Sequence, residues 1–128
     1  MGFNPKDHGF APVGSTMRDS TYCYVRIGRH GKYGRATLML DAWNTAAASR
    51  MFGDRVGVAI DDAGRIVLYA GTARKLSKVA NTDRASVSID VERGRLVGAL
   101  GKFSVMRYDA EPFAGGEAIL LTPAGKID

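Results

Sequence analysis

Residues 54–71 read DRVGVAIDDAGRIVLYAG, and this stretch decides the fold. Val56, Val58 and Ile60 alternate with smaller residues, which is the period of a half-buried β-strand. The tetrapeptide DDAG at 61–64 supplies the acids and the glycine of a tight turn, and RIVLYA follows it as a partner strand. The stretch therefore predicts a β-hairpin.

The residues before the hairpin predict two further strands and a helix. TYCYVRIG at 21–28 and RATLML at 35–40 both alternate as strands do. Asp41 is a good N-cap for the segment AWNTAAASRMF, and Gly53 supplies its stop. One stripe of this helix is expected to be buried, and it comprises Trp43, Ala46, Ala47 and Met51.

The residues after the hairpin return mostly to strand patterns. Residues 71–83 predict either a short helix capped by Thr72 or a short strand over 75–78, whereas RASVSID at 84–90 alternates clearly. A short apolar segment RLVGALG, a strand near KFSVMRY, a longer turn at DAEPFAGG and a strand EAILL follow. About half of the sequence reads as strand. This indicates a mainly β (α+β) fold with one or two short helices, arranged as a small barrel-like domain.

The first segment of the chain differs from the rest. Residues 1–20 contain three glycines and two prolines and have no sustained periodicity. They therefore predict a flexible N-terminal arm in front of one compact domain at 21–128.

A shift of 49 places lays RATLMLD (35–41) over RASVSID (84–90). Carried further, Gly53 falls near Gly101, and GRIVLYAG falls near GEAILLTP with a turn about four residues longer in the second copy. The match predicts two repeat units, at about 22–72 and 73–125, each built as strand, basic loop, strand, helix and hairpin. Such a chain is either a monomeric pseudo-dimer with an internal pseudo-twofold or a protomer of a homodimer.

The net charge of +5 is unevenly distributed. Residues 22–84 hold 11 Lys and Arg against 5 Asp and Glu, whereas residues 85–128 hold 5 against 6. A localised positive field favours a polyanionic partner, of which nucleic acid is the commonest. The single Cys23 excludes an internal disulfide, and no run is long and apolar enough for a signal peptide or a membrane span. We therefore expect a cytoplasmic protein without membrane contact.

The stretch YVRIGRHGKYGR at 24–35 is the strongest candidate for binding a polyanion. Its glycines lack the spacing and the hydroxyl residue of a nucleotide-binding P-loop, and no helix opens after them, so both nucleotide-loop motifs are excluded. We expect the arginines and lysines to contact phosphates, while Tyr33 or His30 enters a groove. The candidate nucleic-acid-binding residues are Arg26, Arg29, His30, Lys32, Tyr33, Arg35, Lys75, Lys78 and Arg84.

Catalytic and metal chemistry find little support in the sequence. His8, His30 and Cys23 stand alone on different segments, so no metal site and no cofactor are expected. The acid pair at 61–62 belongs to a turn and is interpreted as a turn former rather than a general acid and base. An enzyme is not expected.

The order strand, RATLMLD, helix and MFGDRVGVAIDDAGRIVLYAG resembles the AbrB/SpoVT-like swapped-hairpin DNA-binding domain, over roughly 50 residues. Members of that family are bacterial transition-state regulators and antitoxins. Their second hairpin is similar in pattern to residues 56–68, although ML stands here where they usually have IP before the helix. The resemblance implies that DNA is contacted by the first strands and their loop, at positions that correspond to Arg26, Arg29 and Arg35.

These patterns together favour a DNA-binding protein of regulatory or architectural type that binds double-stranded DNA through a basic β-hairpin loop. One alternative is a protein-interaction module, a small inhibitor or adaptor, that places its basic face on an acidic protein partner. Another is single-strand or RNA binding, because Tyr22 and Tyr24 share a strand face with Arg26 and, with Tyr33, offer rings on which bases stack.

Overall fold

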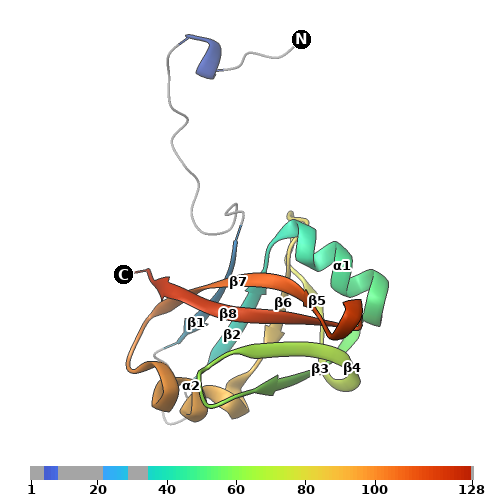
Figure 1. Ribbon diagram of the computed structural model, residues 1–128. Coiled ribbons are helices and arrows are strands. Elements are labelled where there is room, and N and C mark those ends of the chain that lie inside the picture. Colours follow the sequence, from blue (N-terminus) through green and yellow to red (C-terminus); the bar gives the residue numbers. More distant parts are fainter. Residues whose placement is uncertain (1–4, 9–21, 29–34, 128) are drawn as a thin grey trace.

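The computed structural model describes residues 5–8, 22–28 and 35–127, which form the predicted mainly β structure (Figure 1). The strands are β1 (Cys23–Ile27), β2 (Ala36–Leu40), β3 (Arg55–Ile60), β4 (Ile66–Lys75), β5 (Ser77–Lys78), β6 (Ala85–Ser88), β7 (Val105–Phe113) and β8 (Ala118–Lys126). Among the described residues, the α-helices are α1 (Ala42–Phe52) and α2 (Arg93–Leu100), and the 3-10 turns are η1 (Pro5–His8), η3 (Asp90–Glu92) and η4 (Ala114–Gly116). No helix in these ranges is long and apolar enough to cross a membrane.

The predicted flexible arm at 1–20 falls almost entirely outside the described residues. Its described part is Pro5–His8, which forms η1.

The strands form one antiparallel sheet in the order β3-β4-β8-β7-β1-β2-β6-β5. The sheet curls until its terminal strands approach each other. Arg55 at the start of β3 pairs with Lys75 at the end of β4, and the Leu76 N–H, just before β5, donates to Asp54 O at 2.8 Å. The predicted barrel-like form is therefore confirmed, and α1 and α2 lie at opposite ends of the curled sheet (Figure 1).

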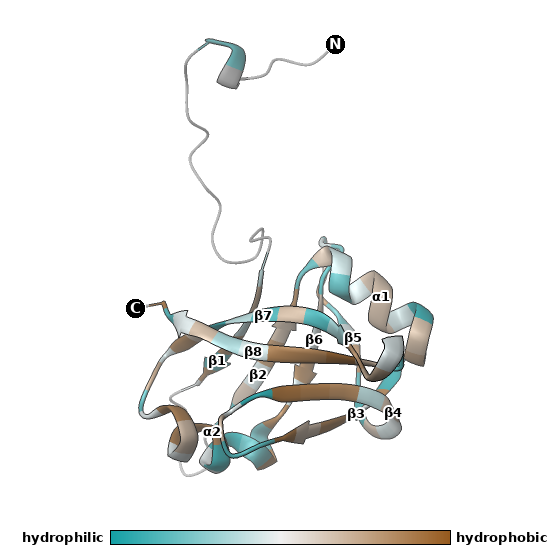
Figure 2. Ribbon diagram, viewed as in Figure 1, coloured by the Kyte–Doolittle hydropathy of each residue, from teal (hydrophilic) through white to brown (hydrophobic). Residues whose placement is uncertain are grey.

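The interior of the curl holds the apolar side chains that the strand alternation selects. Hydrophobic residues are most continuous along β8 and the first half of β4, as the brown ribbon segments show (Figure 2). Burying each Leu, Ile or Val side chain stabilises the fold by about 1.5–3 kcal/mol. The largest fully buried residues are Tyr108, Leu38, Leu40, Ile66, Leu68, Ile89, Leu96, Leu121, Val25, Val56, Val87 and Thr45.

The helix predicted after Asp41 is confirmed as α1. The Asp41 carboxylate accepts the Asn44 N–H at 2.7 Å, as an N-cap does. The helix ends at Gly53, whose φ of 80° lies in the left-handed region that glycine adopts readily.

The buried stripe predicted for α1 is wrong in its largest member. Trp43 is 81 % exposed, and Ala46 is exposed as well, whereas Ala47 and Met51 pack partly against the core. Alanines occur on several sides of this helix, so apolar content alone does not select its inner face. The buried residues of α1 are Thr45 and Ala48.

The undecided segment at 71–83 is a strand followed by a turn, because β4 continues to Lys75 and β5 covers Ser77–Lys78. RLVGALG lies in α2, which is the second short helix of the described chain. The turn between β7 and β8 is shorter than predicted, since β7 extends to Phe113.

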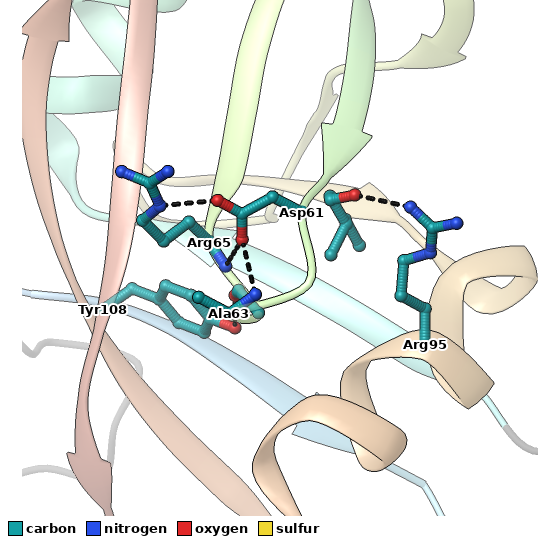
Figure 3. Close-up of polar contacts among 7 residues, drawn as sticks. Asp61, Ala63, Arg65, Arg95 and Tyr108 are labelled. Atoms are coloured by element: carbon teal, nitrogen blue, oxygen red, sulfur yellow. Dashed lines mark hydrogen bonds and ion pairs between the residues drawn. The ribbon is translucent and has the colours of Figure 1, made fainter.

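The turn of the 54–71 hairpin is organised by Asp61 (Figure 3). Its carboxylate accepts the Ala63 N–H at 3.0 Å and the Arg65 N–H at 2.9 Å, and it pairs with the Arg65 guanidinium at 2.6 Å. Desolvation raises the pKa of Asp61, but these hydrogen bonds and the arginine charge outweigh it, so the pKa lies below its ordinary value of 3.8.

Residues from the second half of the chain hold this turn in place (Figure 3). The Tyr108 hydroxyl on β7 donates to Gly64 O at 2.8 Å, and Arg95 on α2 donates to Ile60 O at 2.9 Å. Gly64 has a φ of +78°, and a Cβ there would lie 2.7 Å from Cγ of Leu100. The hairpin therefore depends on contacts with the second predicted unit.

The two predicted units meet where β2 pairs with β6. The register of this pairing is the one expected if an approximate twofold axis relates the units. β2 and β6 pair Thr37 with Ser88 and Met39 with Ser86. The shift of 49 converts Thr37 into Ser86 and Met39 into Ser88, so exchanging the units turns each pair into the other. The pairing of β2 with β6 is thus symmetric about its own centre.

β4 and β8 show the same relation with a slightly larger shift. Ile66 pairs with Leu121, and Leu68 pairs with Ile119. A shift of 53 exchanges these two pairs. The sheet therefore has matching symmetric pairings at β2–β6 and at β4–β8.

The starts of β2 and β6 are also supported in a reciprocal way. Ala36 and Ala85 begin these strands and are 49 positions apart. The Ala36 N–H donates to Asp90 Oδ1 at 2.7 Å, and the Ala85 N–H donates to Thr45 Oγ1 at 2.9 Å. Each strand therefore receives its acceptor from the helical segment that follows the other strand.

Candidate nucleic-acid interface

Only the base of the predicted basic loop lies in the described part of the chain. The Gly28 N–H donates to Arg35 O at 2.8 Å and closes the hairpin between β1 and β2. Arg26 on β1 and Arg35 at the base of the loop are both exposed. The other predicted loop residues, Arg29, His30, Lys32 and Tyr33, lie outside the described residues.

Arg26 belongs to a sheet surface that faces away from the core. On β1, Tyr24 pairs with Met39 of β2 and with Arg107 of β7, while Arg26 pairs with Thr37. Paired residues point to the same side of a sheet. We call this side the outer face and define it by Tyr24, Arg26, Thr37, Met39, Ser86, Ser88 and Arg107.

The outer face has a shallow hollow with hydroxyl groups beside it. The hollow measures about 160 Å³ and is lined by Tyr24, Arg26, Thr37 and Met39. On the neighbouring strand β6, Ser86 pairs with Met39 and Ser88 pairs with Thr37, so their hydroxyl groups lie beside the hollow. Small hydroxyl residues flanked by a guanidinium can donate hydrogen bonds to phosphate oxygens.

Arg84, a predicted DNA contact, is used inside the domain. The residue is only 4 % exposed, and its guanidinium donates to Leu40 O and to Tyr22 O, each at 3.0 Å. It also lies over the Tyr24 ring, with Cζ 5.3 Å from the centroid. A guanidinium placed in this way joins three strands and has no free side for a phosphate, so we remove Arg84 from the proposed surface.

The tyrosines predicted as stacking platforms are already in contact with arginines. Tyr22 and Tyr24 meet edge to face at 6.3 Å, and Arg107 lies over the Tyr22 ring at 5.0 Å. Tyr24 is 4 % exposed beneath Arg84. Base stacking needs an open ring face, and neither of these two rings offers one fully.

The second unit contributes fewer cations to the surface than its sequence suggests. Lys75 and Lys78 are exposed, as a binding role requires. The loop between β5 and β6 is a tight turn, closed by Val79 N–H donating to Arg84 O at 3.0 Å, and Asn81 takes a φ of 63° in it. Between that closing pair stand ANTD, without a cation, whereas RHGKYG stands between the equivalent pair of the first unit.

The charges on this side of the molecule are mixed. Arg107 pairs with Asp109 at 3.7 Å, and both side chains are at least half exposed. Of the predicted binding residues, Arg26, Arg35, Lys75 and Lys78 are exposed and make no ion pair with another described residue. These unpaired charges are available to a polyanion without the loss of an internal contact.

Cys23 lies on the opposite, inner side of β1. Burial raises the pKa of its thiol to about 12, so the thiol stays protonated near neutral pH. Within the described ranges, no group of three His, Cys, Asp or Glu residues could hold a metal ion.

Sequence reasoning missed Arg107. Its place on the outer face depends on the pairing of β1 with β7, more than 80 positions apart in the chain. The alternation of KFSVMRY could have placed Arg107 on the side opposite Met106 and Tyr108, but not beside Tyr24.

The outer face and its flanking cations can bind an anionic surface through hydroxyl, guanidinium and ammonium donors, and they contain no arrangement typical of a nucleophile and base. The chain was compared with models of protein families, with curated proteins and with solved structures, and none of these comparisons gives a match.

Proposed function

We propose that this chain is a cytoplasmic DNA-binding protein of regulatory or architectural type, which contacts double-stranded DNA with its outer face and the adjoining loop between β1 and β2. Phosphate contacts dominate the affinity, because the donors are mostly cations and hydroxyls rather than pairs of groups aimed at base edges.

One observation carries the proposal. Arg26 and Arg35 are exposed, lack an ion-pair partner among the described residues and lie beside a sheet face lined by Thr37, Ser86 and Ser88. Lys75 and Lys78 are likewise exposed and make no ion pair with a described residue. A surface that only served solubility would gain from neighbouring acids that pair with such cations. The basic sequence of the loop at 29–34 adds two more cations, Arg29 and Lys32, next to Arg35.

The arrangement of elements supports the proposed kinship with AbrB/SpoVT-like domains. The order β1-β2-α1-β3-β4 is repeated as β5-β6-α2-β7-β8, and the two sets pair symmetrically at β2–β6 and β4–β8. Members of that family normally dimerise from two short chains. A single chain with this arrangement would present, on one side, the surface that such a dimer presents. We propose the monomeric pseudo-dimer as its working form.

Duplex affinity measured against salt concentration tests the function directly. Four to six phosphate contacts predict that log K falls against log salt with a slope of about −4 to −5. Absence of binding at about 50 mM salt, or an affinity that ignores salt, would contradict the proposal.

A charge reversal with a matched control locates the surface. Arg35→Glu should weaken binding to all duplex sequences about tenfold, because a phosphate contact is lost and a repulsion is gained. Arg50→Glu makes the same change in net charge on the last turn of α1 and should leave affinity almost unchanged. The neighbours of Arg50, Met51 and Phe52, border a different hollow with Tyr69. Equal losses in both variants would mean that only net charge matters.

Two further experiments distinguish DNA binding from the interaction module and from single-strand binding. Pull-down from a nuclease-treated lysate that retains an acidic protein would favour the interaction module. Preference for single strands over duplex in competition would favour the single-strand alternative, although the arginines stacked on Tyr22 and Tyr24 argue against it.

A further inference from the structure

Trp43 is the most conspicuous apolar side chain on the described surface. It is the only tryptophan of the chain, and 81 % of it is exposed, compared with 47 % for Phe113 and 42 % for Tyr69. Tryptophan is normally well buried, because its large ring gains most from leaving water. An open indole on a helix that buries its other side is therefore more typical of a contact residue than of a packing residue.

The position of Trp43 follows from how α1 begins. The helix starts directly after β2, and its first turn is tied to the start of β6 by Thr45, whose hydroxyl accepts the Ala85 N–H at 2.9 Å. Its far end reaches the other side of the barrel, where Phe52 borders a hollow with Tyr69 of β4. Trp43 therefore lies near the end of β2 that is remote from the basic loop.

This end is opposite the basic loop. β2 runs from Arg35 at the loop to Asp41 at the helix, and the exposed indole occurs at the helix end. The turn beside the helix, at 80–83, contains no cation, and Lys78 precedes it on β5. A binding surface that continues toward this end can therefore add an aromatic contact to the cation there.

The second unit has no counterpart of Trp43. The shift of 49 leads from Trp43 to Glu92, which is partly buried and pairs with Arg74 at 3.5 Å. The indole therefore has no equivalent in the second predicted unit.

We propose that Trp43 is a nucleobase contact, an aromatic wedge that stacks on or enters a base step of bound duplex DNA at the end of the outer face remote from the basic loop. The inference rests on the proposed DNA-binding function. Apolar side chains that enter a base step partly unstack it, and aromatic rings gain affinity from stacking with any base. A stacking contact at one end only would give the complex a defined polarity.

The single tryptophan makes the test direct. The emission of Trp43 is followed while an unlabelled 20-base-pair duplex is added at low salt, and affinity is measured separately by the anisotropy of a labelled duplex. We expect the duplex to quench the emission and to protect the indole from acrylamide. Trp43→Ala should weaken binding about tenfold, and Trp43→Phe should retain part of the affinity.

Phe113→Ala is the matched control, since it removes another exposed aromatic ring from β7 outside the outer face. It should leave duplex affinity unchanged, and Trp43→Ala should melt like the original protein because its ring packs on little. If duplex binds while the emission is unchanged and Trp43→Ala binds equally well, the wedge is refuted but the DNA-binding function stands. If the original protein gives no anisotropy change, the DNA-binding function itself is refuted.

Discussion

Arg35 and Arg84 occupy equivalent places in the two predicted repeat units, yet one is exposed and the other is buried. Each stands immediately before a strand of the symmetric β2–β6 pair, and they are 49 positions apart. Arg35 is exposed at the base of the basic loop. Arg84 is 4 % exposed and holds the carbonyl oxygens of Leu40 and Tyr22. The same residue thus serves a surface in one unit and the interior in the other.

The difference follows from the segments around the two arginines. A tight turn stabilised by Thr82 precedes Arg84, with the Thr82 hydroxyl accepting the Arg84 N–H at 3.1 Å. Across from it, the Tyr24 ring on β1 and the carbonyl oxygen of Tyr22, just before β1, contact the guanidinium. Approximate symmetry of the backbone therefore does not impose symmetry of function, and the divergence is expected where the loops differ in length.

The largest expected effect separates these arginines by stability. Arg84→Ala should lower the free energy of unfolding by about 2–3 kcal/mol, because it removes the buried guanidinium that donates to the carbonyl oxygens of Leu40 and Tyr22 and uncovers Tyr24. Arg35→Ala should change it by less than about 0.5 kcal/mol. Urea unfolding followed by circular dichroism measures both, and similar losses would break the comparison.

A smaller effect is expected at the reciprocal supports of β2 and β6. Thr45→Val keeps the side-chain shape but leaves the buried Ala85 N–H unpaired, which should cost about 2 kcal/mol. Asp90→Ala should cost about 1 kcal/mol, since water can reach the exposed site and replace the carboxylate. The same urea titrations apply, and the absence of a loss in both variants would show that the symmetric strand ends do not need these acceptors.

The smallest effect concerns the hairpin turns, which also differ between the units. The carboxylate of Asp61 accepts backbone hydrogen bonds in the β3–β4 turn. The β7–β8 turn instead contains three residues with positive φ, which are Ala114, Gly115 and Gly116. Because the folded-state pKa of Asp61 is depressed, its stabilisation is present above its ordinary value of 3.8 and is lost as pH falls through the folded-state value. Asp61→Asn should thus be less stable than the original protein at pH 6, by less than about 1 kcal/mol, with a smaller difference near pH 3. If the difference in free energy of unfolding is the same at pH 6 and pH 3, the ionisation of Asp61 does not cause it.

Local features of the sequence were sufficient for much of the fold. The β3–β4 hairpin depends on the alternation of Val56, Val58 and Ile60 and on Asp61 and Gly64, which are close together in the chain. The cap and stop of α1 are likewise within one helix. Such signals act over a few residues, so they can be seen without knowing the tertiary structure.

The candidate site required long-range pairings that no local signal contains. The acceptors of Arg84 lie 44 and 62 positions away, and Arg107 reaches the outer face only through β7. The prediction of the inner face of α1 was wrong because that face is fixed by Thr45. The Thr45 hydroxyl accepts the N–H of Ala85, which lies 40 positions later on β6. Burial of a polar group depends on its partners, which alternation cannot identify.

The reciprocal supports of β2 and β6 bear on how such a chain folds. Neither half supplies the acceptor for its own strand, so a polypeptide of half this length would have to find a second molecule, and its folding would vary with concentration. Covalent linkage replaces that encounter by an intramolecular one, at an effective concentration of about millimolar for a short connection. Dilution then no longer dissociates the halves, and each is free to lose features that the other retains.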